Sequence, residues 1–177
     1  MKHGQNPNWF ANSPLIRVNI EKDQSAFVAE HLKDPDSLII PLWRGDPLVS
    51  GGKAAFLSAA SLSEFPKDAP VVVLGVKDGK AYFGVDVSAA PSPDAAPFAD
   101  IGEYMNLRMA AGVLPRDDIV IIGHAQWLFE WHRKHLHCAN CGAATNAAPS
   151  GAKRICPNCE AEHFPRTNPV AIVLAIH

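Results

Sequence analysis

Four cysteines constrain what this chain can fold into more than any other feature. They form two Cys-x-x-Cys pairs, Cys138 with Cys141 and Cys156 with Cys159, and the 177-residue sequence has no other cysteine. Each pair places two thiolates on one side of a tight loop, and two such loops facing one another offer a tetrahedron of sulfur ligands that suits Zn²⁺ with Zn–S bonds of ~2.3 Å. Because four thiolates leave no position open for water, the pattern predicts a structural zinc ribbon and not a catalytic metal.

Other interpretations of the cysteines fit the sequence less well. Two redox centres would need thiolates whose pKa is lowered at helix starts, whereas the second pair follows the strand-like stretch "GAKRI". Iron sites of the rubredoxin type use similar pairs at a generally larger separation, and spacing alone does not choose the metal. His137 could replace Cys138 as a ligand, but two intact pairs make this unnecessary. Disulfides are disfavoured because the cysteines are clustered and no export signal precedes them.

Composition limits the remaining possibilities. With 47% hydrophobic and 19% charged residues, the chain is typical of a globular protein with one ordinary domain and a small appendage. A formal net charge of −2 argues against a surface that attracts nucleic acid or anionic membranes as a whole. No apolar stretch approaches the ~20 residues that span a bilayer, and the first residues lack the apolar core of a signal peptide. We therefore expect a cytoplasmic protein with no membrane partner.

Two predicted β-hairpins occupy the first half of the chain. The first joins strand-like residues 37–43 and 53–59 through the turn residues at 45–47 and 51–52. The second is centred on Asp78-Gly79, a dipeptide suited to a tight turn with positive φ. These hairpins predict an antiparallel β-sheet, and the Ala/Pro-rich residues 89–97 predict a loop that leads from it to helices.

The second half of the chain changes to helical periodicity. Residues 98–114 space apolar side chains at helical intervals, and a longer helix is predicted from about Asp117 to about Leu136, with acidic residues at its start and basic residues at its end. The predicted fold class is therefore α+β. Three aromatic and three histidine residues in this segment are interpreted as core-packing and as structural or solvated side chains, respectively: Trp127, Phe129, Trp131, His124, His132 and His135.

The C-terminal stretches "WLFEWHRKHLHCANCG" and "CPNCEAEHFPRTNPVAIVLAI" resemble the NADH pyrophosphatase branch of the Nudix hydrolases. In that family a helix leads into FCxxCG, a zinc ribbon closes with CPxC, and E-x-x-[YF]-P-R-x-x-P enters the catalytic Nudix domain. "PLWRG" and "NLR" upstream are also similar to the family. The residues at matching places are Trp131, His135, Cys138, Cys141, Gly142, Cys156, Pro157, Cys159, Phe164, Pro165, Arg166 and Pro169.

The resemblance implies an organisation and a function. It implies an N-terminal domain over residues 1–136, a zinc ribbon over 137–165, and the first strand of a catalytic Nudix domain over 166–177. The family hydrolyses the pyrophosphate of NAD(H) to NMN(H) and AMP, as a homodimer using Mg²⁺ or Mn²⁺, with NAD-capped RNA as a further candidate substrate. Residues at positions that would contact the substrate are Phe164, whose ring can stack on a base, Arg108 and Arg44.

The sequence also departs from the family. Nudix hydrolysis uses G-x5-E-x7-R-E-x2-E-E-x-G, whose glutamates hold the activating metal, and no such string occurs in these residues. We therefore expect no catalytic residue in this chain, no activity of the chain alone, and a truncated origin. The alternative is a zinc-ribbon module that binds nucleic acid or protein, with Lys153 and Arg154 contacting phosphates.

Overall fold

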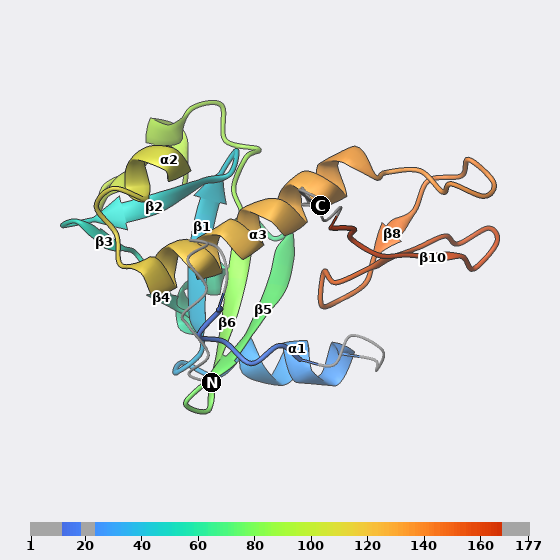
Figure 1. Ribbon diagram of the computed structural model, residues 1–177, viewed down its shortest axis with the longest axis horizontal. Coiled ribbons are helices and arrows are strands. Elements are labelled where there is room, and N and C mark those ends of the chain that lie inside the picture. Colours follow the sequence, from blue (N-terminus) through green and yellow to red (C-terminus); the bar gives the residue numbers. More distant parts are fainter. Residues whose placement is uncertain (1–11, 19–23, 168–177) are drawn as a thin grey trace, which may run out of the picture.

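The computed structural model describes residues 12–18 and 24–167. A mixed β-sheet flanked by helices forms the larger part, and a small three-stranded ribbon follows it (Figure 1). The α+β fold predicted from the sequence is confirmed. The predicted strand over 166–177 falls largely on residues 168–177, which lie outside the described residues.

The larger sheet has the strand order β3-β2-β1-β6-β5, with β4 on β1 and β7 on β2. Its strands are β1 (Leu38–Trp43), β2 (Asp46–Ser50), β3 (Lys53–Ala54), β4 (Leu57–Ser58), β5 (Val71–Lys77), β6 (Lys80–Asp86) and β7 (Glu103–Tyr104). The other strand pairs of this sheet are antiparallel, as predicted, but β1 and β6 are parallel, so the sheet is mixed. The chain leaves β4 through the 3₁₀ helix η1 (Ala59–Glu64) and returns along the edge strand β5, so the hairpin to β6 brings β6 beside β1 in the same direction.

One of the two predicted hairpins forms as expected, and the other has an additional strand in its connection. The Asp78-Gly79 turn joins β5 to β6 as expected, with φ of 51° and 77°. In the first hairpin, the residues expected to form one long connection instead contain strand β2, whose Pro47 pairs with Leu42 of β1. Two residues, Arg44 and Gly45, are enough for the turn, so the apolar residues after them extend the sheet.

The long helix α3 (Arg116–Lys134) matches its predicted range to within two residues and has acidic side chains in its first turn and basic ones in its last. Residues 98–114 form only the short helix α2 (Leu107–Ala110), because Glu103 and Tyr104 pair with β2 and the Asn106 side chain caps the helix by accepting the amide N–H of Arg108. The other helices are α1 (Ser25–His31) and the 3₁₀ helix η2 (Pro93–Ala95).

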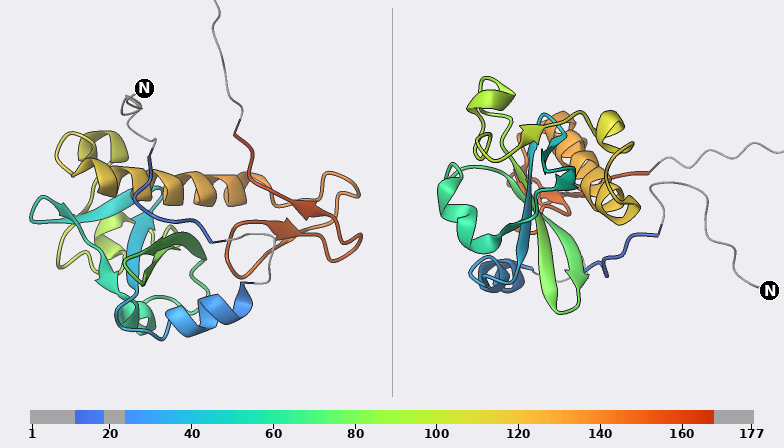
Figure 2. Two further views of the ribbon diagram at one scale, coloured as in Figure 1. Left: turned by 60° about the horizontal axis from the view of Figure 1, so that its bottom comes forward. Right: turned by 90° about the vertical axis from the view of Figure 1, so that its left-hand side faces the viewer.

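Hydrophobic side chains bury both faces of the sheet. Helix α3 crosses one face, where Ile122, Ala125 and Phe129 pack on Ile40 and Leu74, while α1 and η1 lie against the other face (Figure 2). Phe129 and Trp131 are buried and Trp127 packs against the first cluster, as predicted. Neither core cluster includes a residue after position 129. No helix in the described part of the chain combines the length and apolarity needed to cross a bilayer.

The ribbon follows α3 directly. Strands β8 (Asn146–Ala147), β9 (Arg154–Ile155) and β10 (Glu162–His163) form an antiparallel sheet with the order β10-β9-β8. Each strand is only two residues long. So small a sheet buries little apolar surface, and it needs another source of stability.

Candidate metal centre and substrate residues

The two Cys-x-x-Cys turns of the ribbon have the same backbone geometry. In the first, the amide N–H of Gly142 donates to the Cys138 carbonyl at 2.9 Å, and in the second the amide of Glu160 donates to the Cys156 carbonyl at 2.9 Å. Both turns then close with a bond from the amide of the first cysteine, to the carbonyl of Ala143 or Ala161. Each turn therefore presents its two sulfur atoms in the same way.

These turns bring four sulfur atoms together. All four Sγ atoms lie within 4.8 Å of one another, with Cys138 and Cys159 separated by 3.6 Å and Cys141 and Cys156 by 3.5 Å. A tetrahedral ion with Zn–S bonds of ~2.3 Å needs sulfur atoms ~3.8 Å apart, whereas a disulfide needs ~2.0 Å. The arrangement thus fits a four-thiolate metal and not disulfides. Among the described residues, His137 is not part of this cluster.

Several polar groups surround the sulfur atoms. The His163 Nε2 atom lies 3.3 Å from the Cys138 sulfur, and the amide N–H of Asn140 donates to the same sulfur at 3.4 Å. The backbone amide of Ala143 and the side chain of Asn158 lower the pKa of Cys141 to about 6. Such donors stabilise thiolates bound to a metal. His163 was not identified from the sequence, because only the pairing of β10 with β9 places it beside Cys138.

A buried arginine connects the ribbon to helix α3. Arg154 is 8% exposed, and it donates to the side chain and carbonyl of Thr145 at 2.7 Å and 2.5 Å. Its third contact is the Nδ1 atom of His132 at 3.2 Å, and the Nε2 atom of His132 lies 2.7 Å from the Gly151 carbonyl. Since a guanidinium only donates and a carbonyl only accepts, His132 must be neutral with its proton on Nε2. Burial, which lowers the pKa of His132, favours the same state.

The ribbon also contacts the edge of the sheet. The amide N–H of Val73 in β5 donates to the Ser150 carbonyl at 2.8 Å. Gly151 lies so close to the sheet that a Cβ atom there would be 2.5 Å from a methyl carbon of Val72. The ribbon that carries the four cysteines is therefore joined by direct contacts to the edge of the larger sheet.

Phe164 lies where the ribbon chain returns towards the sheet. Its side chain is 42% exposed and lines a cavity of about 150 Å³ together with Leu74, His124 and Trp127. The Lys153 ammonium lies 5.9 Å from the centre of the Phe164 ring. Burial, followed by the charge of Arg17, lowers the pKa of His124 to about 4, so this histidine is neutral at neutral pH.

The two predicted substrate arginines lie elsewhere. Arg44, in the β1–β2 turn, lines a larger cavity of about 600 Å³ on the other side of helix α3. Arg108 is an exposed residue of helix α2. Neither arginine lines the cavity of Phe164. The described residues therefore do not join the three predicted substrate residues into one site.

Comparisons with known proteins agree with this architecture. Residues 36–131 match the model of the NADH pyrophosphatase-like rudimentary NUDIX domain, and residues 133–164 match that of the NADH pyrophosphatase zinc ribbon domain. The mitochondrial NAD(P)H pyrophosphatase NUDT13 of Mus musculus is 31% identical over 103 residues, covering 54% of this chain and 29% of the relative.

Two further relatives match longer stretches at lower identity. The chloroplastic Nudix hydrolase 19 of Arabidopsis thaliana is 27% identical over 168 residues, covering 80% of this chain and 38% of the relative. The NAD-capped RNA hydrolase NudC of Stutzerimonas stutzeri is 26% identical over 144 residues, covering 73% of this chain and 50% of the relative. The chain thus spans half or less of the length of these relatives. Because the rudimentary NUDIX match alone covers more than half of its residues, the chain belongs to the NADH pyrophosphatase family of Nudix proteins.

Proposed function

We propose that these residues form the N-terminal domain and zinc ribbon of an enzyme that hydrolyses the pyrophosphate of NAD(H) to NMN(H) and AMP. The proposal rests mainly on one observation, the succession of an NADH pyrophosphatase-like rudimentary NUDIX domain and an NADH pyrophosphatase zinc ribbon with four clustered cysteines. The names of the relatives include NAD(P)H pyrophosphatase and NAD-capped RNA hydrolase. NAD-capped RNA is accordingly proposed as a second substrate.

The proposed role of the metal follows from its four sulfur ligands. Zn²⁺ would be held by the four cysteines, and because all of its positions would be taken by sulfur it would brace the ribbon and activate no water. Residues 1–136 would supply the supporting domain, residues 137–165 the brace, and residues 166–177 the entry to a catalytic domain. Mg²⁺ or Mn²⁺ would act in that catalytic domain, where Nudix glutamates position water against the pyrophosphate.

Phe164, Arg108 and Arg44 are proposed to contact the substrate of the complete enzyme. Of the three residues, Phe164 has the strongest structural support for this role, because its ring is partly exposed, lines a cavity and lies near the ammonium group of Lys153. We also propose a homodimer, and analytical ultracentrifugation measures this oligomeric state directly. A cytoplasmic location stays a prediction, and two of the relatives are named as mitochondrial and chloroplastic.

The 177-residue chain, incubated with NADH and Mg²⁺, is expected to release no AMP above background. The reason is that it contains no glutamate string of the Nudix type to hold the catalytic metal. Chromatographic quantification of AMP checks this, with a NudC-type enzyme as positive control. Mg²⁺-dependent turnover by the purified chain would show that its residues contain a catalytic centre.

In an enzyme that joins these residues to a catalytic Nudix domain, Phe164→Ala should raise KM for NADH about 5- to 150-fold, since base stacking contributes ~1–3 kcal/mol. Steady-state kinetics with NADH and with a pyrophosphate that lacks a base separates stacking from packing. A stacking ring affects only the first substrate. Equal changes with both substrates would assign Phe164 to packing alone.

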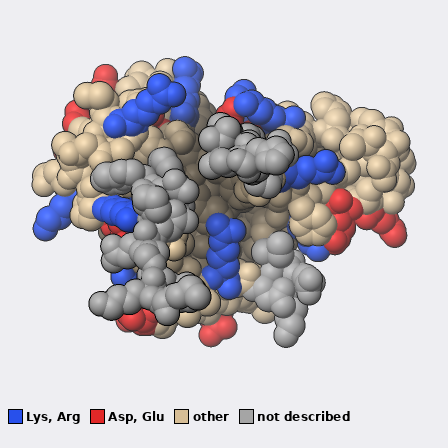
Figure 3. All heavy atoms as spheres, viewed as in Figure 1, with Lys and Arg blue, Asp and Glu red and all other residues tan. Residues whose placement is uncertain are grey.

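The surroundings of Lys153 and Arg154 argue against the alternative of a ribbon that binds nucleic acid through these two residues. Arg154 is buried and bonded to Thr145 and His132, and Lys153 pairs with Glu162 at 2.5 Å. On the face shown in Figure 3, Lys and Arg side chains are dispersed among neutral atoms and form no continuous basic stripe. Salt-dependent micromolar binding of RNA by a monomeric chain would nevertheless favour the module over the enzyme fragment.

A further inference from the structure

The larger cavity lies between the β1–β2 turn, the end of β6 and helix α3. Its volume is about 600 Å³, which is within the range of small-molecule sites. Phe129 contributes an aromatic surface, and the other lining residues are Arg44, Gly45, Asp86, Ser88, Gln126, Glu130 and Arg133. Two guanidinium groups from elements far apart in the sequence therefore reach one cavity.

Arg44 occupies a backbone position that favours other residues. It is the first residue of a two-residue turn and has φ of 51°, followed by Gly45 with φ of 89°. The β5–β6 turn has the same geometry and uses Asp78-Gly79, with φ of 51° and 77°. Asn, Asp and Gly are favoured at the first position, and a long side chain there is strained. Strain of this kind is concentrated at functional sites, so an arginine at this strained position points to a functional role for its side chain.

Contacts with Trp43 and Ser88 position Arg44 in the lining of the cavity, which also includes the carboxylate of Asp86. Its guanidinium carbon lies 4.6 Å from the centre of the Trp43 ring, and its amide N–H donates to the Ser88 hydroxyl oxygen at 2.7 Å. The Trp43 ring is itself fixed by a hydrogen bond from Nε1 to the Ala90 carbonyl at 2.9 Å. In the described part of the chain, Arg44 forms no ion pair with a carboxylate.

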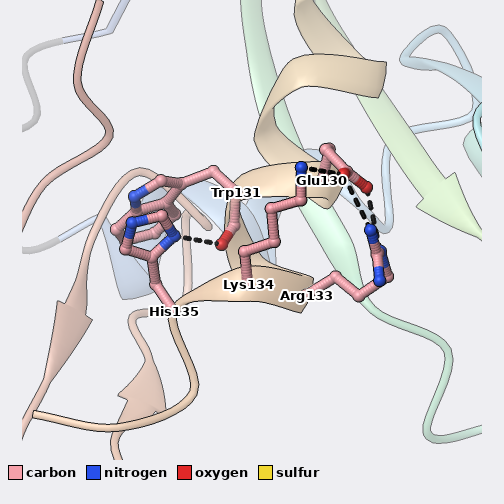
Figure 4. Close-up of polar contacts among 5 residues, drawn as sticks. All are labelled: Glu130, Trp131, Arg133, Lys134 and His135. Atoms are coloured by element: carbon pink, nitrogen blue, oxygen red, sulfur yellow. Dashed lines mark hydrogen bonds and ion pairs between the residues drawn. The ribbon is translucent and has the colours of Figure 1, made fainter.

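Arg133 is held on the opposite wall by Glu130. Two guanidinium nitrogens of Arg133 donate to the Glu130 carboxylate at 2.9 Å and 2.7 Å, and the Lys134 ammonium lies 2.6 Å from the same carboxylate (Figure 4). Hydrogen bonds from Arg133 and then Lys134 lower the pKa of Glu130 to about 2, so the carboxylate is ionised. Two cations share this one anion; of these three residues, Arg133 and Glu130 line the cavity and Lys134 does not.

We propose that this cavity binds the phosphate group of a small organic phosphate of the nucleoside monophosphate type, with Arg44 and Arg133 as the groups that contact it. Planar guanidinium groups suit phosphate oxygens, and both are positioned before a ligand arrives. Ser88, which follows β6 and donates its hydroxyl hydrogen to Asp86, also lines the cavity, and Phe129 offers the organic part an apolar surface. This site gives a specific form to the substrate contact proposed above for Arg44. The identity of the natural ligand rests on the proposed NADH pyrophosphatase function.

Titration of the zinc-loaded chain tests the site without any turnover. At low ionic strength, AMP and inorganic phosphate are expected to bind saturably in the micromolar to millimolar range, whereas adenosine, which lacks the phosphate, should not. Amide chemical shifts of Gly45 and Ser88 report where binding occurs. Arg44→Asn should weaken AMP binding about tenfold, equivalent to ~1.4 kcal/mol, and Arg133→Gln should do the same. Lys67→Ala, which removes an exposed cation outside the cavity, should leave binding unchanged.

Arg44→Asn is informative because Asn is favoured in the left-handed backbone of the turn. Its midpoint of thermal unfolding should not fall, since relief of strain offsets the lost contact with Trp43. Weaker AMP binding by a variant of undiminished stability would support the site.

Absence of AMP and phosphate binding, equal binding by Arg44→Asn, or equal binding of adenosine would each overturn the proposal. A negative result in this titration does not contradict the proposed NADH pyrophosphatase function, because the experiment contains neither NADH nor a catalytic domain.

Discussion

Cys156→Ser is expected to abolish tight zinc binding and to unfold residues 137–165 while the N-terminal sheet stays folded. Cys156 is fully buried and supplies one of the four clustered sulfur atoms. Structural zinc contributes ~10–16 kcal/mol in comparable small domains, far more than three strands of two residues each can provide. The N-terminal domain should remain folded because both of its core clusters are built without ribbon residues.

Hydrogen exchange measured on amides resolves the two parts of the molecule. In Cys156→Ser, protection should be lost in the ribbon and at Val73, whose amide donates to Ser150 at the junction, but kept in the rest of β5 and β6. His137→Gln is the matched control, since His137 is an exposed neighbour of the first pair and not one of the clustered groups. It should retain both zinc and protection. An intact ribbon in zinc-free Cys156→Ser protein would refute the role of the metal as a brace.

Arg154→Met should destabilise the zinc-loaded chain by about 2–4 kcal/mol. Methionine fills part of the space but leaves the Thr145 carbonyl and the His132 Nδ1 atom without the donors that satisfy them. Each buried polar group left unpaired costs ~1–3 kcal/mol. The measurement is urea unfolding at constant zinc concentration, followed by a probe in the ribbon.

Arg133→Met is the control for this prediction. The Arg133 side chain is 68% exposed and pairs with Glu130 on the helix surface, so its loss should cost less than ~1 kcal/mol. Arg154→Lys should lie between the two, because one ammonium keeps the charge but cannot contact Thr145 and His132 together. Equal losses for Arg154→Met and Arg133→Met would show that the buried arginine does not hold the junction together.

The features that the sequence predicted well depend on neighbouring residues. The Cys-x-x-Cys pairs, the Asp78-Gly79 turn and the boundaries of helix α3 each follow from a short stretch of chain. A turn dipeptide, a metal-binding spacing and a helical repeat with charged ends all act within a few residues. The resemblance to NADH pyrophosphatases, which is confirmed, was also carried mainly by the residues around the two cysteine pairs.

The features that the sequence did not predict depend on contacts between distant segments. The parallel pairing of β1 with β6 and the insertion of β2 arise from the order in which the chain fills the sheet. Only the alternative of a nucleic-acid-binding ribbon predicts Arg154 at the surface, and Arg154 is buried because His132, 22 positions earlier, contacts it across the junction. The cavity between Arg44 and Arg133 likewise exists only once the β1–β2 turn lies beside helix α3.

The coordination of the metal in the purified chain tests the central claim most directly. X-ray absorption at the zinc edge, combined with metal analysis, should find about one zinc per chain surrounded by four sulfur atoms at ~2.3 Å, as a closed structural site requires. An oxygen or nitrogen atom in place of one sulfur, or a chain that is folded throughout without zinc, would contradict the assignment of the four cysteines as a brace.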